Sequence, residues 1–137
     1  MKSDIFVIGA GKFGSKIASL LYDKGQNVLV IDKADKAFHK LDDFSGFTIN
    51  GDATDLSLLE SLGIKDAKMV IITTDDDNTN LFIADVCFYL FDIRKIYVRL
   101  SDTDKGTLLE NTSIIGIYPF NLSLDYFLNL EKSEETK

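Results

Sequence analysis

The sequence predicts an α/β domain whose core is a doubly wound parallel sheet of six strands. Short apolar runs alternate with longer amphipathic stretches along most of the 137 residues, which is the pattern of repeated strand–helix–strand units. A glycine-rich turn joins the first apolar run to the first amphipathic stretch, and the second apolar run ends on an acid. Right-handed crossovers then favour the strand order 3-2-1-4-5-6, with the glycine turn at the switch point.

The glycine-rich turn has the spacing of a dinucleotide-binding motif. Residues 9–14 have the sequence Gly-Ala-Gly-Lys-Phe-Gly and directly follow the apolar residues 5–8. Gly9 permits a tight turn, Gly11 lets the backbone approach a pyrophosphate, and Gly14 lets the helix pack closely on the sheet. The free N–H groups at the start of this helix favour a bound phosphate.

The second strand supplies an acidic residue at the distance that this motif requires. Residues 28–31 are apolar and Asp32 follows them. Its carboxylate can accept hydrogen bonds from ribose hydroxyls and would repel a 2′-phosphate, which favours NAD or an adenosine nucleotide over NADP. The expected fold is therefore Rossmann-like.

The remaining strands follow the same alternation of apolar runs and turns. Residues 69–72, for example, form an apolar run that is followed by two threonines and then by acids and Asn, as expected where a buried strand ends. We expect strands near Asp4–Ile8, Asn27–Ile31, Gly46–Asn50, Met69–Thr73, Lys95–Arg99 and Ile114–Ile117.

Helices are expected between the strands. The first has apolar residues at helical spacing and ends at Lys24-Gly25, where glycine can close the helix. Acids precede three later helices as N-caps: Asp55, Asp76 or Asp77, and Asp102. The expected helices are Lys12–Asp23, Ala34–Leu41, Asp55–Leu62, Asn78–Phe91 and Thr103–Glu110.

The C-terminal segment is expected to form an interface helix. We assign residues 1–118 to the nucleotide-binding domain, residues 119–130 to this helix and residues 131–137 to a disordered tail. The apolar residues of the helix cover more than one face, so the domain itself cannot bury them all and a partner surface is expected. These residues are Leu122, Leu124, Tyr126, Phe127, Leu128 and Leu130.

Composition excludes several classes of function. The net charge of -7 argues against nucleic acid and anionic lipid as partners. A single cysteine precludes an internal disulfide, and the sequence has neither a run of eighteen apolar residues nor a secretory leader, so we expect a cytosolic location without direct membrane insertion. The length leaves no room for a separate substrate domain, which argues against a complete dehydrogenase.

Other strand ends should meet the glycine turn, because ligands of open α/β sheets bind at the carboxyl ends of the strands. Asp52 can accept from an adenine amino group or cap a turn. Thr73, Thr74 and Asp75 can line the ribose and phosphate side of the pocket. Arg99 can pair with a phosphate or with one of the carboxylates.

Catalytic and metal-binding constellations are not expected. His39, the one histidine, falls on a surface helix far from the glycine turn. Cys87 falls inside an apolar helix without a histidine spaced to activate it. The sequence has no cluster of Cys and His with the spacing of metal ligands. We therefore predict a binding protein rather than an enzyme.

Motifs along nearly the whole chain resemble those of one family. They are residues 5–14, Val30-Ile31-Asp32-Lys33, Gly51-Asp52-Ala53-Thr54, residues 74–80 with the sequence Thr-Asp-Asp-Asp-Asn-Thr-Asn, and Ile96-Tyr97-Val98-Arg99. The chain resembles the N-terminal nucleotide-binding domain, called KTN or RCK, of the Trk/Ktr potassium-uptake regulators. Many relatives have Arg in place of Lys12 and Glu in place of Phe120.

The resemblance implies a regulatory subunit that binds NAD(H), ATP or ADP. It further implies homodimers that assemble into a ring on an integral membrane potassium transporter or channel, at the inner face of the cell membrane. The alternative is an NAD-dependent oxidoreductase fragment that lacks its catalytic domain. The candidate ligand-binding residues are Gly9, Ala10, Gly11, Lys12, Phe13, Gly14, Asp32, Lys33, Asp52, Ala53, Thr73, Thr74, Asp75, Asn80 and Arg99.

Overall fold

In a computed structural model of the chain, which describes residues 2–41 and 44–135, the described residues form one parallel sheet of six strands. The strand order is β3-β2-β1-β4-β5-β6, and each neighbouring pair is parallel, as predicted. The strands are β1 (Ile5–Ile8), β2 (Val28–Asp32), β3 (Phe47–Asn50), β4 (Met69–Ile72), β5 (Ile96–Arg99) and β6 (Ile114–Ile117).

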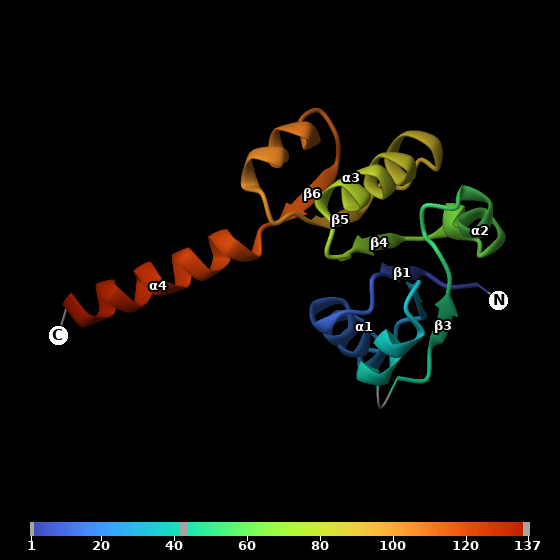
Figure 1. Cartoon of the computed structure of the whole chain (residues 1–137), viewed down its shortest axis with the longest axis horizontal. Coiled ribbons are helices and arrows are strands. Elements are labelled where there is room, and N and C mark those ends of the chain that lie inside the picture. Colours follow the sequence, from blue (N-terminus) through green and yellow to red (C-terminus); the bar gives the residue numbers. More distant parts are fainter. Residues whose placement is uncertain (1, 42–43, 136–137) are drawn as a thin grey trace.

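Helices cover both faces of this sheet (Figure 1). On one face, α1 (Lys12–Asp23) and a 3₁₀ helix (Asp35–Lys40) pack on an apolar cluster that contains Val7 and Val30. On the other face, α2 (Leu56–Ser61) and α3 (Asp77–Asp85) contribute to a larger cluster. The central strands β1, β2 and β4 are therefore buried from both sides, which explains why their sequences do not alternate with polar residues.

Three expected helices differ from regular α-helix in the structure. The segments Asp35–Lys40 and Thr103–Leu109 are 3₁₀ helices, and α3 ends in a π-helical turn at Val86–Leu90. Short connections favour the tighter 3₁₀ geometry, and Gly106 further weakens the α-helical preference of the second segment. The positions of these two short helices agree with those expected from the sequence, and only the structure shows that both are 3₁₀ helices.

The predicted N-caps are confirmed. Asp55 accepts hydrogen bonds from the backbone N–H groups of Ser57 and Leu58, and Asp76 accepts from that of Asn78. Asp102 caps the 3₁₀ helix through the N–H of Asp104. Asp76 is thus the cap of α3, which leaves the Asp77 carboxylate for other contacts.

The C-terminal helix α4 (Pro119–Glu135) extends away from the rest of the protein (Figure 1). It begins at Pro119, where the missing N–H costs no hydrogen bond, and it contains no buried residue. The expected disorder was wrong for residues 131–135, because Glu and Lys favour helix and no breaker intervenes; residues 136–137 lie outside the described part. No helix in the described part is both long and apolar enough to cross a membrane.

Candidate functional site

A cavity of about 570 Å³ lies where the strands end at the carboxyl edge of the sheet. The strand register aligns Ile8 with Ile31 and Ile72, so the turns that follow β1, β2 and β4 leave the sheet side by side. The cavity lining comprises Ile8, Gly9, Gly11, Ile31, Asp32, Lys33, Ala34, Ala37, Gly51, Asp52, Ala53, Thr54, Thr73, Thr74, Asp75, Asp76, Thr79, Ile83 and Arg99.

Each glycine of the turn after β1 has a different environment. Gly9 has φ +100°, in the left-handed region that favours glycine, and lies against the backbone of Thr73. A Cβ at Gly14 would overlap the Gly9 carbonyl oxygen and the Thr73 hydroxyl. A Cβ at Gly11 would meet no atom within 4 Å. Gly9 and Gly14 are therefore needed for packing, whereas Gly11 leaves space open at the cavity.

The start of α1 differs from the starts of α2 and α3. Its N-cap is Gly11, which offers no side-chain acceptor. The caps of α2 and α3 are carboxylates that occupy the first N–H groups of those helices. The N–H groups at the start of α1 are therefore left for an anion, and the helix dipole favours negative charge there.

Asp32 is fixed by two backbone groups. One carboxylate oxygen accepts from the Ala10 N–H at 2.7 Å, and the other accepts from the Ala34 N–H at 2.7 Å. These bonds connect the glycine turn to the end of β2 and hold the carboxylate at the cavity. Each oxygen has a further lone pair, so Asp32 can still accept from ligand hydroxyls.

Asp52 is held in a similar way at the end of β3. Its Oδ1 accepts from the Thr54 N–H at 2.9 Å and from the Thr54 hydroxyl at 2.7 Å. These hydrogen bonds lower the pKa of Asp52 against the opposing effect of burial, and the charge of Lys33 lowers it further. Asp52 is thus a fixed negative charge at neutral pH, and its second oxygen can accept from a ligand amino group.

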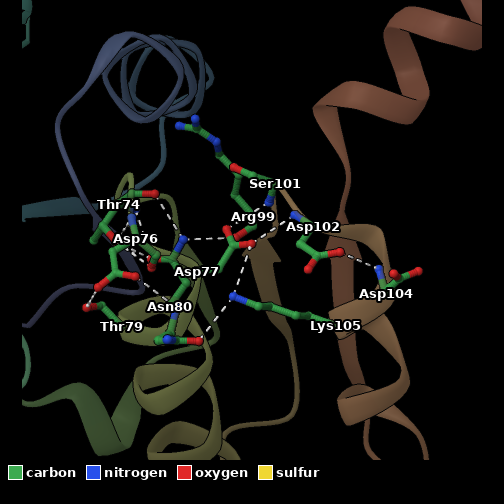
Figure 2. Close-up of polar contacts among 11 residues, drawn as sticks. Thr74, Asp76, Asp77, Thr79, Asn80, Arg99, Ser101, Asp102, Asp104 and Lys105 are labelled. Atoms are coloured by element: carbon green, nitrogen blue, oxygen red, sulfur yellow. Dashed lines mark hydrogen bonds and ion pairs between the residues drawn. The ribbon is translucent and has the colours of Figure 1, made fainter.

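The ends of β4 and β5 are joined by Asn80, which is fully buried. Its amide nitrogen donates to the carbonyl oxygens of Thr74 at 3.0 Å and Arg99 at 2.9 Å, while its amide oxygen accepts from Thr74 N–H at 3.1 Å (Figure 2). Thr73 directly precedes Thr74 in the chain, and its hydroxyl donates to the carbonyl oxygens of Ile8 and Gly9. The cavity wall on this side is therefore rigidly connected to the glycine turn.

The structure brings most candidate residues of the sequence to this cavity. Five do not line it: Ala10, Lys12, Phe13, Gly14 and Asn80. Three of these five support the site from outside, because Ala10 binds Asp32, Gly14 packs against Gly9, and Asn80 joins two strand ends. The other two lie on α1, where Lys12 is exposed and Phe13 is half-buried.

Sequence reasoning did not select several residues of the cavity lining. Ala34 and Ala37 are small residues that lie three positions apart, shortly after Asp32. This spacing could have indicated a helix face next to a ligand. Ile8 and Ile31 precede the selected turns directly. The others are Gly51, Thr54, Asp76, Thr79 and Ile83.

Groups that could perform other chemistry lie elsewhere in the described part of the chain. Cys87 is buried, and burial raises the pKa of its thiol to about 12, so it is not a thiolate at neutral pH. His39 is exposed on the 3₁₀ helix after β2 and does not line the cavity. Within residues 2–41 and 44–135, no group of three or more His, Cys, Asp or Glu could hold a metal ion.

Comparison with curated proteins finds relatives in potassium-transport systems. The chain is 28% identical over 115 residues to a Trk system potassium uptake protein TrkA homolog of Pyrococcus horikoshii, covering 83% of the chain and 50% of that protein. It is 33% identical over 110 residues to the glutathione-regulated potassium-efflux system protein KefC of Salmonella arizonae, covering 80% of the chain and 18% of that protein. The chain thus spans about half, or less, of these relatives.

Solved structures with the same fold include ligand complexes. The GsuK channel bound to NAD superposes with a TM-score of 0.82 at 26% identity, over 98% of this chain and 24% of that one. The AMP-bound form of a Kef C-terminal domain from Shewanella denitrificans has a TM-score of 0.73 at 25% identity, over 96% of this chain and 79% of that one. GsuK bound to ADP has a TM-score of 0.80 at 26% identity, over 95% of this chain and 34% of that one.

The family comparison covers almost the whole α/β body. Residues 5–117 match the TrkA-N domain, from the first residue of β1 to the last residue of β6. This extent includes the glycine turn, Asp32 and the other strand ends that form the cavity. The resemblance found in the sequence motifs is thereby confirmed, and the chain belongs to the TrkA-N domain family.

Proposed function

We propose that this chain is a non-catalytic regulatory module that binds an adenine nucleotide, NAD(H) or ATP/ADP, in the cavity at the carboxyl edge of the sheet. The observation that carries this proposal is the hydrogen bond between the Ala10 N–H and the Asp32 carboxylate. It brings an uncapped helix start and a fixed carboxylate to one cavity, and these two groups suit a phosphate and a ribose diol.

The candidate residues divide the ligand among the strand ends. The turn at Gly9 and Gly11 and the start of α1 would receive phosphate, and Asp32 would accept from ribose. Asp52 and Ala53 would flank adenine, while Thr74, Asp75 and Arg99 would close the pocket. The complexes of GsuK with NAD and ADP, and of a Kef domain with AMP, support this class of ligand.

Calorimetric titration tests the proposed function. The purified chain is titrated with NAD, NADH, ATP and ADP, and with NADP as the matched control. We expect saturable binding of at least one of the four ligands and much weaker binding of NADP, because the Asp32 carboxylate repels a 2′-phosphate. Absence of binding by all four ligands would contradict the proposal, and NADH oxidation with a carbonyl substrate would favour the oxidoreductase alternative.

We further propose that the chain acts at the inner face of the cell membrane as part of a potassium transporter or channel. The relatives named Trk and Kef support this location and this partner. Binding would act through differential affinity of the ligand for two arrangements of the assembled domains. Residues 1–118 would bind the ligand, and the helix from residue 119 would connect one copy to the next.

A homodimer through α4 is the first step of the proposed ring. Seven large apolar side chains of α4 are between 46% and 67% exposed, which a lone helix would leave in water: Phe120, Leu122, Leu124, Tyr126, Phe127, Leu128 and Leu130. The sheet offers a candidate surface to receive this helix. Tyr97 packs on the α1-side cluster, and its register partner Ile115 on the same face is 48% exposed. We propose that α4 of a second copy covers this face.

One substitution in α4 tests the dimer. Phe120, Leu124 and Phe127 share a helix face, so we expect Phe127→Asp to place a charge in the interface and convert a dimer to a monomer. Light scattering with size-exclusion chromatography measures the mass. Asn129→Asp, on the opposite helix face, adds the same charge and should remain dimeric. A dimeric Phe127→Asp variant, or a monomeric wild-type chain, would contradict the interface.

A further inference from the structure

Asp77 makes contacts that its place in the sequence does not explain. It is the first residue of α3, but Asp76 is the cap of that helix. The Asp77 carboxylate instead accepts from the backbone N–H groups of Ser101 at 2.8 Å and Asp102 at 2.9 Å, two residues that follow β5 (Figure 2). It also lies 3.9 Å from the Lys105 ammonium. Its side chain is only 10% exposed.

The first turn of α3 therefore holds the end of β5 from two sides. Asn80, three residues after Asp77 and one helical turn along, donates to the Arg99 carbonyl oxygen at 2.9 Å. Asp77 holds the two N–H groups just beyond Leu100, which is fully buried. Hydrogen bonds thus fix the backbone on both sides of the buried Leu100. They hold the Arg99 carbonyl before it and the Ser101 and Asp102 N–H groups after it.

The carboxylates around Arg99 compete with a phosphate for its guanidinium. The cavity lining has two cations, Lys33 and Arg99, against four carboxylates: Asp32, Asp52, Asp75 and Asp76. Among the ion pairs of the described residues, none involves Arg99. Its side chain extends away from the Asp77 carboxylate in Figure 2. The guanidinium is therefore available to an anionic ligand, and its planar donors suit a phosphate.

We propose that Asp77 is a positioning residue that directs Arg99 toward the phosphate of the bound nucleotide by holding the backbone of Ser101 and Asp102. This inference rests on the proposed nucleotide binding and adds a residue that does not line the cavity. According to this inference, part of the affinity for the phosphate depends on the contacts between α3 and the segment after β5, and not on the pocket wall alone.

The protonation of Asp77 agrees with this role. Burial alone would raise the pKa of Asp77, but hydrogen bonds from Ser101 and Asp102 and the charge of Lys105 outweigh that effect and lower it. Asp77 is thus ionised at neutral pH. Replacement by asparagine removes the charge and leaves one acceptor oxygen in place of two.

A double-mutant cycle with two ligands tests the proposal. Kd for ADP and for adenosine is measured by calorimetry on wild type, Asp77→Asn, Arg99→Ala and the double variant. We expect each single substitution to weaken ADP binding by about 10-fold, the scale of one lost charge-assisted hydrogen bond, and to leave adenosine binding unchanged. In the Arg99→Ala background, Asp77→Asn should have little further effect, because both changes remove the same contact.

Two further variants separate positioning from folding. Asp104→Asn removes a charge from the 3₁₀ helix Thr103–Leu109, which contains Lys105, without removing a side-chain contact to the end of β5. This variant should bind both ligands as wild type does. Asp77→Glu keeps the charge and should recover part of the ADP affinity. If Asp77→Asn proves unfolded by circular dichroism, Lys105→Met, which weakens the same contact, should lower ADP affinity alone.

The outcomes distinguish this inference from the proposed function. Equal weakening of ADP and adenosine binding by Asp77→Asn, or full additivity with Arg99→Ala, would overturn the positioning role while nucleotide binding stands. Binding of neither ADP nor adenosine by the wild-type chain would overturn this inference, and absence of binding by NAD, NADH, ATP and ADP alike would overturn the proposed function with it.

Discussion

Replacement of Gly14 by alanine is expected to lower the free energy of unfolding by about 1–3 kcal/mol or more, the usual cost of overpacking a rigid site. A Cβ at this position meets the carbonyl oxygen of Gly9 and the hydroxyl of Thr73, and Thr73 itself is buried and hydrogen bonded to the end of β1. Neither neighbour is the free end of a flexible side chain. The helix α1 must therefore move off the sheet, which also separates it from the cavity.

Thermal or chemical unfolding of the ligand-free protein measures this effect. For a chain of this size, the expected loss corresponds to a decrease of about 3–10 °C in Tm. Gly11→Ala is the matched control in the same turn, because its Cβ meets nothing within 4 Å and its φ of -70° suits alanine. We expect that variant to keep wild-type stability. Equal stability of the two variants would show that α1 does not pack on Gly9 as described.

Replacement of Asp32 by alanine is expected to abolish nucleotide binding and to weaken the ligand-free fold. The fold loses two acceptors, and the partly buried Ala10 N–H is left without a partner, at a cost of about 1–3 kcal/mol. The ligand loses the carboxylate that would accept from ribose. At a ligand concentration 100 times Kd, the wild-type chain should gain about 2.7 kcal/mol of stability from binding, and the variant should gain none.

Thermal shift with and without NAD or ADP separates the two effects, because the first is present without ligand. Asp35→Ala is the control, since Asp35 is an exposed acid on the neighbouring 3₁₀ helix and does not line the cavity. It should retain the full ligand-induced shift. A wild-type shift in the Asp32→Ala variant would remove Asp32 from the site.

Much of the fold and the site could be predicted because their signals are local. The six apolar runs gave the strands, and the right-handed crossover fixed their order, which the structure confirms. The glycine spacing and Asp32 at the end of the second run indicated the site, because residues that follow parallel strands leave the sheet at one edge. The caps Asp55, Asp76 and Asp102 were also local, since each accepts from N–H groups within three residues.

The family motifs gave only part of the site. The segment 74–80 was a family motif of which only Thr74, Asp75 and Asn80 were selected for the pocket, and its members have different roles in the structure. Thr74, Asp75, Asp76 and Thr79 line the cavity, Asn80 joins β4 to β5, and Asp77 holds the segment after β5. A run of adjacent polar residues does not reveal these roles, because side chains on a helix start point in different directions.

The sequence by itself determined the order of elements, the sheet and the edge at which the candidate site lies, because periodicity and turn chemistry act between near neighbours along the chain. Only the tertiary structure decided which glycine is open to the cavity, which acid holds the backbone that carries Arg99, and which apolar residues stay uncovered. These features depend on contacts between distant segments, such as Asp77 with Ser101 and Asp102. Packing of the whole sheet and its helices sets those contacts, and no local pattern encodes them.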